Sequence, residues 1–581
     1  MNIQNFMARD KGTGKISVYP TEPYFLDVDY DNNYNIIGWH LYSNTYHWVG
    51  KTAQDLVDRL NVIIELFDLT DKYVVTTRVS DPTGKQKTIA ADKISDSKHD
   101  YIIIYVKNLK IARGIFKNVK IDVYSNYLIV MDYFDVRTYT DFGDKESIKK
   151  WYTEFVDECR AYLSPAQAMR KRLLRSVGQD KTAKNIYPPT IRDYKYERGG
   201  IHGGAIYSQD SSGHVYERPM LALDLTSAYI FGLLIRKHCM SERKAVPITD
   251  WSNYLGNSEY GSIGTYIIEY SFMYRYIRCF KDFNGNQFKI GHNTVTVIMD
   301  NIALNTFINL PHMTIHKIEC LKLNEFKIDY MPQYYRDFAY KLYADKQSLD
   351  RDSIEYKNHK VYLNSGVYGN ILTDIFKYLP QEQDESKSAY RDRLKKHYYK
   401  TVLTDSAKIS TIPLWGVYTL SYTKQLVFEL ATQLVGWRYS DTDSIYCDDT
   451  PENRAKLEAF NSKIRTEVKQ FCNKFGYDYN ILQDLGTFKK EAEIVKFRSF
   501  GVKMYAYQKI EHKRDIKTGE LKTIYVDEMH FAGCTYDEAP ANLWSDKWKP
   551  TAGNKLIPYL DKNGDYRERH VGAEALMLFT E

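Results

Sequence analysis

Two aspartates interrupt an aromatic, β-prone run, "WRYSDTDSIY", at residues 437–446. Side chains alternate between the two faces of a strand, so Asp441 and Asp443 are expected to point to the same face. Two carboxylates that close repel each other unless a cation lies between them or one is protonated. Mg²⁺ prefers oxygen ligands and is commonly held by carboxylates plus substrate phosphates. The pattern predicts a magnesium site, and the alternative is an Asp-rich hairpin turn, where aspartate is common anyway.

A third carboxylate ends the apolar run "MLALDLTSAYIFGLLI", residues 220–235, which predicts a buried strand followed by an apolar segment. Asp224 ends the strand part, and a carboxylate at the end of a buried strand needs a partner. With the first two aspartates it predicts a two-metal site of the kind that serves phosphoryl transfer. The alternative is that Asp224 only caps a helix N-terminus.

A lysine is placed to meet the phosphates of a substrate. The region 334–368 predicts a long charged helix ending at Gly369, and "KVYLNSGVYGN" within and after it begins at Lys360. Asn364 follows four residues later, on the same helical face. Lys346 lies fourteen residues earlier and is a candidate second phosphate contact. The alternative for each lysine is a solvated surface charge.

The composition sets broad limits on the class of protein. A chain of 581 residues is long enough for two to four domains, and its net charge of +6 permits a basic face for nucleic acid without requiring one. The 51 tyrosines fit either a coding bias or stacking on sugars and bases. The seven cysteines include no CxxC pair, which argues against a disulfide framework or zinc site and favours a reducing cytoplasm. No signal peptide and no membrane span are expected.

The chain divides near residue 190. Residues 101–116 and 127–136 are β-rich, 145–176 predicts a helical stretch, and 178–193 has the composition of a linker. Residues 420–435 fit an amphipathic helix. We therefore expect an N-terminal α/β domain followed by a larger α+β body.

Three motifs in a fixed order resemble those of family B DNA polymerases, and more narrowly the protein-primed type of phages and linear plasmids. "DLTSAYI" resembles the family's DxxSLYP, "KVYLNSGVYG" resembles KxxxNSxYG, and "YSDTDS" matches YxDTDS. "KMY" (503–505) resembles the KxY motif that holds the primer, and "YERGG" (196–200) resembles YxGG. "GVYTLSYTKQL" and "FAGC" also resemble segments of this family.

The resemblance implies an RNase H-like 3′–5′ exonuclease domain followed by a right-hand polymerase domain with palm, fingers and thumb. The long connection from Asp224 to Lys360 matches the subfamily's first insertion, which contacts the terminal protein, and a second lies between the last two motifs. The implied boundaries are exonuclease-like domain 1–189, polymerase domain 190–581, palm 190–235 and 413–510, insertion 1 about 236–335, fingers 336–369, insertion 2 about 370–412 and thumb about 535–581.

The resemblance also assigns roles to single residues. The metal ligands would be Asp224, Asp443 and the carbonyl of Leu225, with Asp441 as the remaining catalytic carboxylate. The substrate-binding residues would be Lys360, Tyr229, Asn364, Tyr368 and Ser227, among which Tyr229 would exclude a 2′-hydroxyl. The residues that hold primer and DNA would be Lys503, Tyr505, Tyr196, Gly199 and Gly200.

Two motifs depart from the family pattern. Ile230 stands where the family has Pro, and motif B reads NSxxYG with one extra residue, which weakens the assignment of Tyr368. A second Gly pair (203–204) follows the first, so the pair that serves the YxGG role stays open.

The exonuclease motifs are incomplete. "YFLDVDYDN" offers Asp27 and Asp29 for a DxE motif, and "VKNLKIARG" aligns Asn108 but places Ala112 where an aspartate is expected. The third motif fits poorly at Asp157, one residue too far from its tyrosine. A missing carboxylate removes a ligand that a two-metal site needs. We predict weak or absent 3′–5′ exonuclease activity, from a deliberate Asp→Ala substitution at 112 or from natural loss; the alternative is a misaligned motif.

The resemblance implies a DNA-dependent DNA polymerase that replicates a phage or linear-plasmid genome by two-metal nucleotidyl transfer. It implies two Mg²⁺ ions, with Mn²⁺ as a substitute, and as partners template-primer DNA, dNTPs and a terminal protein. A monomer in the cytoplasm of a bacterial host is expected. The alternatives are an RNA-templated polymerase, which would favour a YxDD-type motif, and a catalytically retired homologue that only binds DNA.

Overall fold

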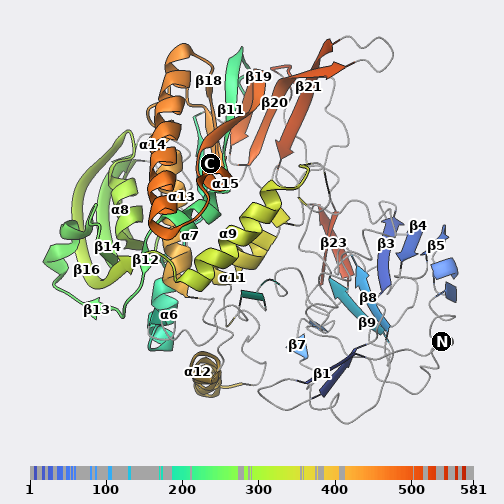
Figure 1. Cartoon of the computed structure of the whole chain (residues 1–581), viewed down its shortest axis with the longest axis horizontal. Helices are drawn as coiled ribbons and strands as arrows, with labels where there is room; N and C mark the ends of the chain where they lie inside the picture. The colour runs from blue at the N-terminus through green and yellow to red at the C-terminus, as the bar shows by residue number, and fades with distance from the viewer. Residues whose placement is uncertain are drawn as a thin grey trace.

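A computed structural model gives the fold of the chain (Figure 1). It describes residues 6–9, 16–19, 24–30, 36–42, 47–52, 54–56, 58–59, 79–80, 86–87, 102–106, 128–132, 169, 172–173, 186–209, 212–272, 280–284, 288, 291–351, 353, 356, 359–360, 362–372, 376, 385–404, 412–501, 503–514, 521–531, 542–546, 548, 556–560 and 566–570.

A seven-stranded sheet forms the centre of the C-terminal part. Its order is β10-β17-β18-β11-β19-β20-β21, and all neighbours are antiparallel. The bounds are β10 (Ala205–Ser208), β17 (Tyr439–Thr442), β18 (Ser444–Asp448), β11 (Tyr216–Leu225), β19 (Phe488–Gly501), β20 (Met504–Arg514) and β21 (Leu521–Phe531). Strand β11 lies between β18 and β19, so segments more than 200 residues apart in sequence become neighbours.

The two faces of this sheet differ in what covers them. One face carries a tyrosine-rich cluster that includes Tyr439, Tyr446, Tyr505 and Tyr507. The other face joins the main core, where helices α13 (Pro413–Ala431), α14 (Pro451–Phe475) and α7 (Ala228–Ile235) pack (Figure 1). The aspartates predicted as metal ligands lie at or next to the ends of these strands. The packed helices therefore hold in place the sheet that positions those aspartates.

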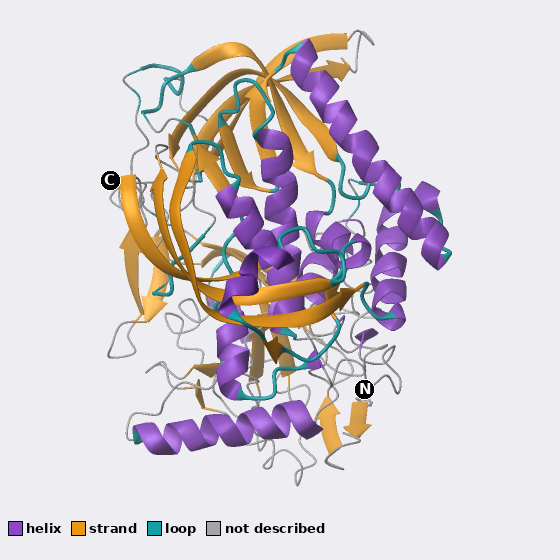
Figure 2. Cartoon of the chain, turned by 90° about the vertical axis from the view of Figure 1, so that its left-hand side faces the viewer, coloured by secondary structure: helices purple, strands orange, loops and turns teal. Residues whose placement is uncertain are grey.

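A second sheet occupies the region expected as the first insertion. Its bounds are β12 (His238–Cys239), β13 (Lys244–Ala245), β14 (Tyr260–Phe272), β15 (Gly291–Asp300) and β16 (Met313–Asp329). The 3-10 helix η3 (Ile248–Tyr254) and helix α8 (Asn301–Ile308) accompany it. Its strands curve strongly, as the side view shows (Figure 2).

The N-terminal part contains a mixed five-stranded sheet of order β5-β4-β3-β8-β9, in which β8 runs parallel to β3 and β9. The bounds are β3 (Tyr24–Tyr30), β4 (Ile36–Tyr42), β5 (His47–Gly50), β8 (Ile102–Val106) and β9 (Leu128–Asp132). The strands predicted in 101–116 and 127–136 are therefore confirmed as β8 and β9. Three two-stranded pairs complete the set: β1 (Phe6–Arg9) with β2 (Ile16–Tyr19), β6 (Val79–Ser80) with β7 (Gln86–Lys87), and β22 (Leu556–Leu560) with β23 (Tyr566–His570).

Several helical predictions need correction. The long helix expected over 334–368 is interrupted: α9 (Gln333–Gln347) ends at a turn, and a π-helix, η4 (Tyr362–Tyr368), precedes α11 (Gly369–Leu372). Helix α13 was expected to be amphipathic, but nearly all of its residues are buried because it contacts α7, α8 and α14. The predicted buried strand in 220–235 is confirmed as the end of β11, and the apolar segment after it forms the helix α7.

The remaining helices are α6 (Ile191–Arg198), α12 (Lys387–Thr404) and α15 (Tyr479–Leu482). Helix α6 begins after Thr190, whose side chain accepts a hydrogen bond from the backbone N–H of Asp193, so a capped helix starts where the linker was expected to end. Among the described helices, none combines the length and apolarity needed to cross a bilayer.

Candidate active site

The "DTD" segment forms a tight turn rather than a continuous strand. Strand β17 ends at Thr442 and β18 begins at Ser444, which leaves Asp443 in the turn between them. Thr442 has a φ of 67°, and the Asp443 N–H donates to the Asp441 carbonyl over 2.8 Å. The expectation that both aspartates lie on one continuous strand is therefore wrong, because a left-handed residue redirects the chain between them, although the charge of Asp441 still acts on Asp443.

Asp224 lies directly beside this turn. It ends β11 opposite Ser444, and the N–H of Leu225 donates to the Asp443 carbonyl over 2.9 Å. Burial, together with the negative charge of Asp443, raises the pKa of the Asp224 carboxyl above its ordinary value. The pKa of Asp443 is also raised, chiefly by burial. The positive charge of Lys360 opposes both shifts, so Lys360 lies within electrostatic reach of the pair.

Sequence reasoning missed one acidic neighbour of this pair, Glu491. The β11–β19 register shifts between Ala222 and Leu223, whose partners are Ala492 and Lys490. Glu491 is thus the extra residue of a β-bulge, and its charge contributes to the raised pKa values of Asp224 and Asp443. The charge cluster after residue 488 was visible in the sequence, but the bulge that aims one member at the site was not.

Asp441 has a different environment from the other two aspartates. Its carboxylate accepts hydrogen bonds from the Thr442 hydroxyl over 3.0 Å and from Lys503 Nζ over 3.0 Å. Within the described part of the chain, no three His, Cys, Asp or Glu side chains converge closely enough to form a metal-binding group. The site therefore consists of the Asp224–Asp443 pair, with Asp441 paired to a lysine beside it.

Lys503 and Tyr505 are held next to Asp441. The Lys503 backbone N–H donates to the Tyr439 hydroxyl over 2.7 Å, and Lys503 itself has a φ of 56°. Tyr505 is buried and its hydroxyl contacts that of Tyr446 at 3.2 Å. The structure thus brings the "KMY" segment to the turn, with Lys503 exposed and Tyr505 packed in the sheet.

The lysines of the helical segment also gather near the site. Lys346 on α9 is 5% exposed, and its Nζ donates to the Ser227 hydroxyl over 2.9 Å. Burial, together with the charges of Lys360, Arg351 and Lys489, lowers the pKa of Lys346 to about 8. Lys346 and Lys360 are therefore electrostatic neighbours. Ser227, which precedes α7 with a φ of 50°, connects Lys346 to the strand that carries Asp224.

Tyr229 and Tyr368 stack on each other with ring centroids 3.9 Å apart and an interplanar angle of 9°. Tyr229 comes from α7 and Tyr368 from the end of the π-helix. The charges of Asp443 and Asp441 contribute to a raised pKa of Tyr229, after burial, so the stack borders the carboxylates. Asn364, in contrast, is exposed on the π-helix, and no described contact joins it to the carboxylates.

The two Gly pairs have different surroundings. Gly199 ends helix α6, and Gly200 is buried after it. A Cβ at Gly204 would lie 2.9 Å from the Thr442 side chain, whereas one at Gly203 would meet nothing within 4 Å. The second pair therefore contacts the DTD turn. The Tyr196 hydroxyl accepts a hydrogen bond from the Thr265 hydroxyl over 3.4 Å, and the Lys322 ammonium group lies over the Tyr196 ring. These two contacts join α6 to the second sheet.

The candidate exonuclease residues are described only in part. Asp27 and Asp29 lie in β3, which runs parallel to β8. Asn108, Ala112 and Asp157 lie outside the described residues.

The fold resembles that of solved structures of Phi29 DNA polymerase. A ternary complex with primer-template DNA and incoming nucleotide substrates, a post-translocation binary complex with primer-template DNA, and an orthorhombic crystal form match with TM-scores of 0.55, 0.58 and 0.57. Each match has 12% sequence identity and covers 94% of this chain and 98% or 99% of the other. No protein-family model and no curated protein matches the sequence. The chain therefore has the fold of this DNA polymerase along almost its whole length.

Proposed function

We propose that the chain is a DNA-dependent DNA polymerase. The observation that carries the proposal is the pair of partly buried carboxylates, Asp224 and Asp443, joined by the backbone bond from Leu225 to Asp443 in a fold shared with Phi29 DNA polymerase. Lys360 and Lys346 supply the positive charge that a triphosphate requires beside them. No motif of an RNA-templated enzyme competes with this arrangement.

The residues fit a divalent cation. Two partly buried carboxylates whose pKa values are raised by desolvation and by neighbouring negative charge are stabilised as anions by a cation between them. Asp224, Asp443 and the Leu225 carbonyl would hold Mg²⁺ or Mn²⁺, with Asp441 beside them. When bound, the ions would lower the pKa of the primer hydroxyl and stabilise charge on the phosphates.

The side chains around the pair would position the substrates. Lys360 and Lys346 would bind the triphosphate as point charges, with Ser227 releasing Lys346 from its present hydrogen bond. Lys503 would hold the primer end beside Asp441. The Tyr229–Tyr368 stack would form the surface under the nucleotide sugar, where a close ring excludes a 2′-hydroxyl.

Priming by a terminal protein is part of the proposal. Along the chain, the strands of the second sheet, β12 to β16, follow α7 and precede α9. The protein-primed subfamily has its first insertion at this point of the sequence. The test is initiation without a DNA primer: purified terminal protein, template and labelled dATP should give a covalently labelled protein. Extension of DNA primers alone, with no labelled protein, would restrict the function to ordinary polymerisation.

Primer extension with Mg²⁺ on a primed template tests the polymerase assignment. We expect Asp443→Ala to reduce extension by about 10³-fold or more, because it removes one of the two paired carboxylates. Asp449→Ala is the matched control, since that aspartate follows the same hairpin but pairs with Arg454 away from the site. If Asp443→Ala extends primers as well as the parent, the assignment is wrong and a DNA-binding role without catalysis replaces it.

A further inference from the structure

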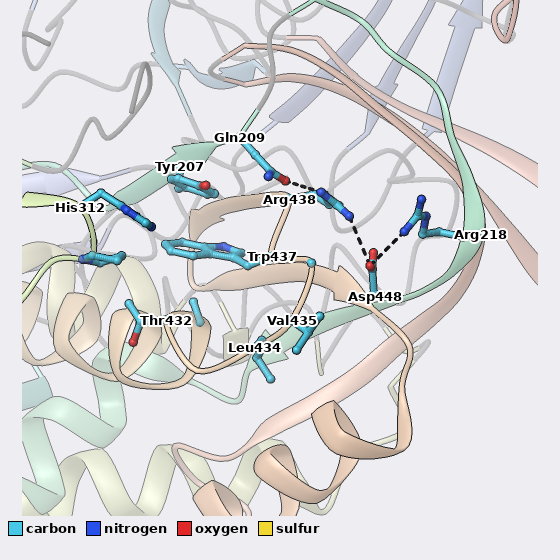
Figure 3. Close-up of a pocket in the computed structure, with 13 residues that line it drawn as sticks. Tyr207, Gln209, Arg218, His312, Thr432, Leu434, Val435, Trp437, Arg438 and Asp448 are labelled. Atoms are coloured by element: carbon cyan, nitrogen blue, oxygen red, sulfur yellow. Dashed lines mark hydrogen bonds and ion pairs between the residues drawn. The ribbon is translucent and has the colours of Figure 1, made fainter. Parts of the chain in front are cut away.

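Figure 3 shows a cavity of about 470 Å³ lined by Arg218, Arg438 and Asp448. It lies at the end of β11 and β18 opposite the carboxylates, because Asp448 pairs with Met220 while Ser444 pairs with Asp224. The beginning of β11, the end of β18 and residues 431–438 line it, and the turn after α8 contributes His312. Along β18, Ser444 beside the catalytic turn and Asp448 at the cavity are four residues apart, or roughly 13 Å at 3.3 Å per residue. The cavity is therefore separate from the site at Asp224 and Asp443.

Two arginines converge on one carboxylate in this cavity. Arg438 donates from Nη2 to Asp448 Oδ2, and Arg218 donates from Nη1 to the same oxygen, each over 3.3 Å (Figure 3). Arg438 also donates from Nη1 to Gln209 Oε1 over 2.6 Å. Two guanidinium groups against one carboxylate leave the cluster with an excess of positive charge.

The guanidinium groups have donors to spare. A guanidinium carries five N–H donors, and the bonds to Asp448 are longer than the roughly 2.7–2.9 Å of a strong charge-assisted bond. Among the described residues, Arg438 Nε is buried without a hydrogen-bond partner. The side chain of Arg218 is 52% exposed, so its remaining N–H groups can reach a ligand.

The cluster is held in place by its surroundings. The Arg438 guanidinium lies over the Tyr216 ring at 4.6 Å, and Trp437 stacks on Tyr207 at 3.8 Å. Gly436 has a φ of 63°, and a Cβ there would lie 2.2 Å from the Asp448 carboxylate. The backbone therefore approaches the carboxylate as only glycine allows. A donor-rich cavity with fixed groups is organised to receive a ligand before one arrives.

We propose that this cavity is a second phosphate-binding site, distinct from the triphosphate site at Lys360. The planar guanidinium fork matches the several acceptor oxygens of a phosphate, and two forks that share one carboxylate can each turn an edge toward such a group. The cavity volume lies in the range of small-ligand pockets, roughly 300–1,000 Å³. The phosphate belongs either to a free nucleotide or to the DNA backbone, and both present the same chemistry. The proposal goes beyond polymerase activity and does not depend on it.

Binding of dAMP and of inorganic phosphate to the full-length protein in EDTA tests the site by calorimetry. EDTA removes the metal-dependent contribution of Asp224 and Asp443. We expect Arg218→Ala to weaken binding about tenfold, the effect of one charged hydrogen bond, and Arg218→Lys to weaken it less. Asp448→Asn should tighten binding several-fold because it removes the competing negative charge. Arg454→Ala is the matched control: its side chain is 60% exposed, it pairs with Asp449, and it does not line the cavity.

Duplex DNA distinguishes the two sources of phosphate. If a backbone phosphate occupies the cavity, Arg218→Ala should lower the slope of log K against log salt for duplex binding by about one. If Arg218→Ala leaves the salt dependence of duplex binding unchanged but loses dAMP binding, the ligand of the cavity is a free nucleotide. The proposal is overturned if dAMP, phosphate and duplex all bind Arg218→Ala and Asp448→Asn as they bind the parent. Primer extension by the parent decides the polymerase function separately, so failure of one leaves the other standing.

Discussion

At the scale of single residues, the site depends on a backbone conformation that a β-branched residue rarely adopts. Thr442 has a φ of 67°, and conformations of this kind cost of order 1–3 kcal/mol and persist where the surroundings enforce them. Here the enforcing contacts are the Thr442 hydroxyl on Asp441 and the backbone bond from Asp443 to the Asp441 carbonyl. This conformation places Asp443 in the turn, where its carboxylate lies within electrostatic reach of both Asp224 and Asp441.

The raised pKa of Asp224 makes a prediction about stability and pH. A carboxyl whose pKa is higher in the folded chain than in the unfolded chain binds more protons when folded, so the free energy of unfolding falls as pH rises from about 4 through the folded pKa. In EDTA we expect Asp224→Asn to remove part of that fall, by at least about 1.4 kcal/mol, which corresponds to one pKa unit. Thermal unfolding at pH 5 and pH 8 measures it.

The difference between the two proteins is the informative quantity, because the buried histidines His202 and His238 have lowered pKa values and act with the opposite sign in both proteins. Mg²⁺ at pH 8 should raise the unfolding temperature of the parent and leave Asp224→Asn nearly unchanged. If the free energy of unfolding in EDTA depends on pH in the same way in the parent and in Asp224→Asn, the surroundings of Asp224 do not raise its pKa.

Tyr368 offers a second residue-scale prediction. Its ring is buried against Tyr229, and among the described residues its hydroxyl has no hydrogen-bond partner. Tyr368→Phe should therefore change the free energy of unfolding by no more than about 0.5 kcal/mol, or stabilise the protein slightly, because an unpaired buried polar group is removed. Tyr368→Ala should cost about 3–5 kcal/mol through the cavity it leaves. Urea unfolding of both variants measures this, and a costly Phe substitution would reveal a partner for the hydroxyl.

At the scale of elements, the site forms where short irregular segments of the chain contact one another. Gly204 begins the approach to β10 and lies against Thr442, while the bulge in β19 turns Glu491 toward the carboxylates. The π-helix brings Tyr368 onto Tyr229 of α7. Each of these features adjusts the position of a side chain by a local irregularity that a regular strand or helix would not provide.

Gly204 and Gly203 form a matched pair for testing this. Gly204→Val should push the DTD turn out of position, because a Cβ there lies 3.1 Å from the Thr442 Cα as well as 2.9 Å from its side chain. We expect a loss of about 10²-fold in primer extension, the usual cost of misplacing reacting groups by about 1 Å. Gly203→Val has open space and should keep activity within about twofold of the parent. Equal effects of the two substitutions would argue that the contact with Thr442 is unimportant.

At the scale of the whole molecule, one sheet draws its strands from three distant parts of the sequence. Strand β11 supplies Asp224, the β17–β18 hairpin supplies Asp443, and β19 with β20 supplies Glu491 and the Lys503 segment. The buried helix α13 supports this sheet from one side, with α14 packed against it. The N-terminal sheet, which contains β3 and β8, shares no strand with this central sheet, as expected for a separate domain.

The predicted loss of exonuclease activity is tested at this scale. Ala112→Asp should restore degradation of labelled single-stranded DNA by at least about tenfold over the parent, because it returns a carboxylate that a two-metal site needs. Primer extension should stay unchanged, since Asp224 and Asp443 belong to the seven-stranded sheet, to which the described strands before residue 190 contribute nothing. Rapid degradation by the parent itself would show that residue 112 is not a ligand position.

The sequence by itself determined the buried strand that ends at Asp224 and the apolar segment after it, because local hydrophobic patterning leaves a direct signal in a short stretch of residues. It also singled out Asp224, Asp443 and Lys360 as neighbours, through the motifs that contain them. It also predicted a division near residue 190, where α6 begins with a capped turn. Only the tertiary structure decided that Asp443 lies in a left-handed turn, that Asp441 faces Lys503, and that Gly204 and Glu491 reach the same place. The reason is physical: these features depend on contacts between strands hundreds of residues apart, and no local pattern records which residue of a distant strand an irregular turn will meet.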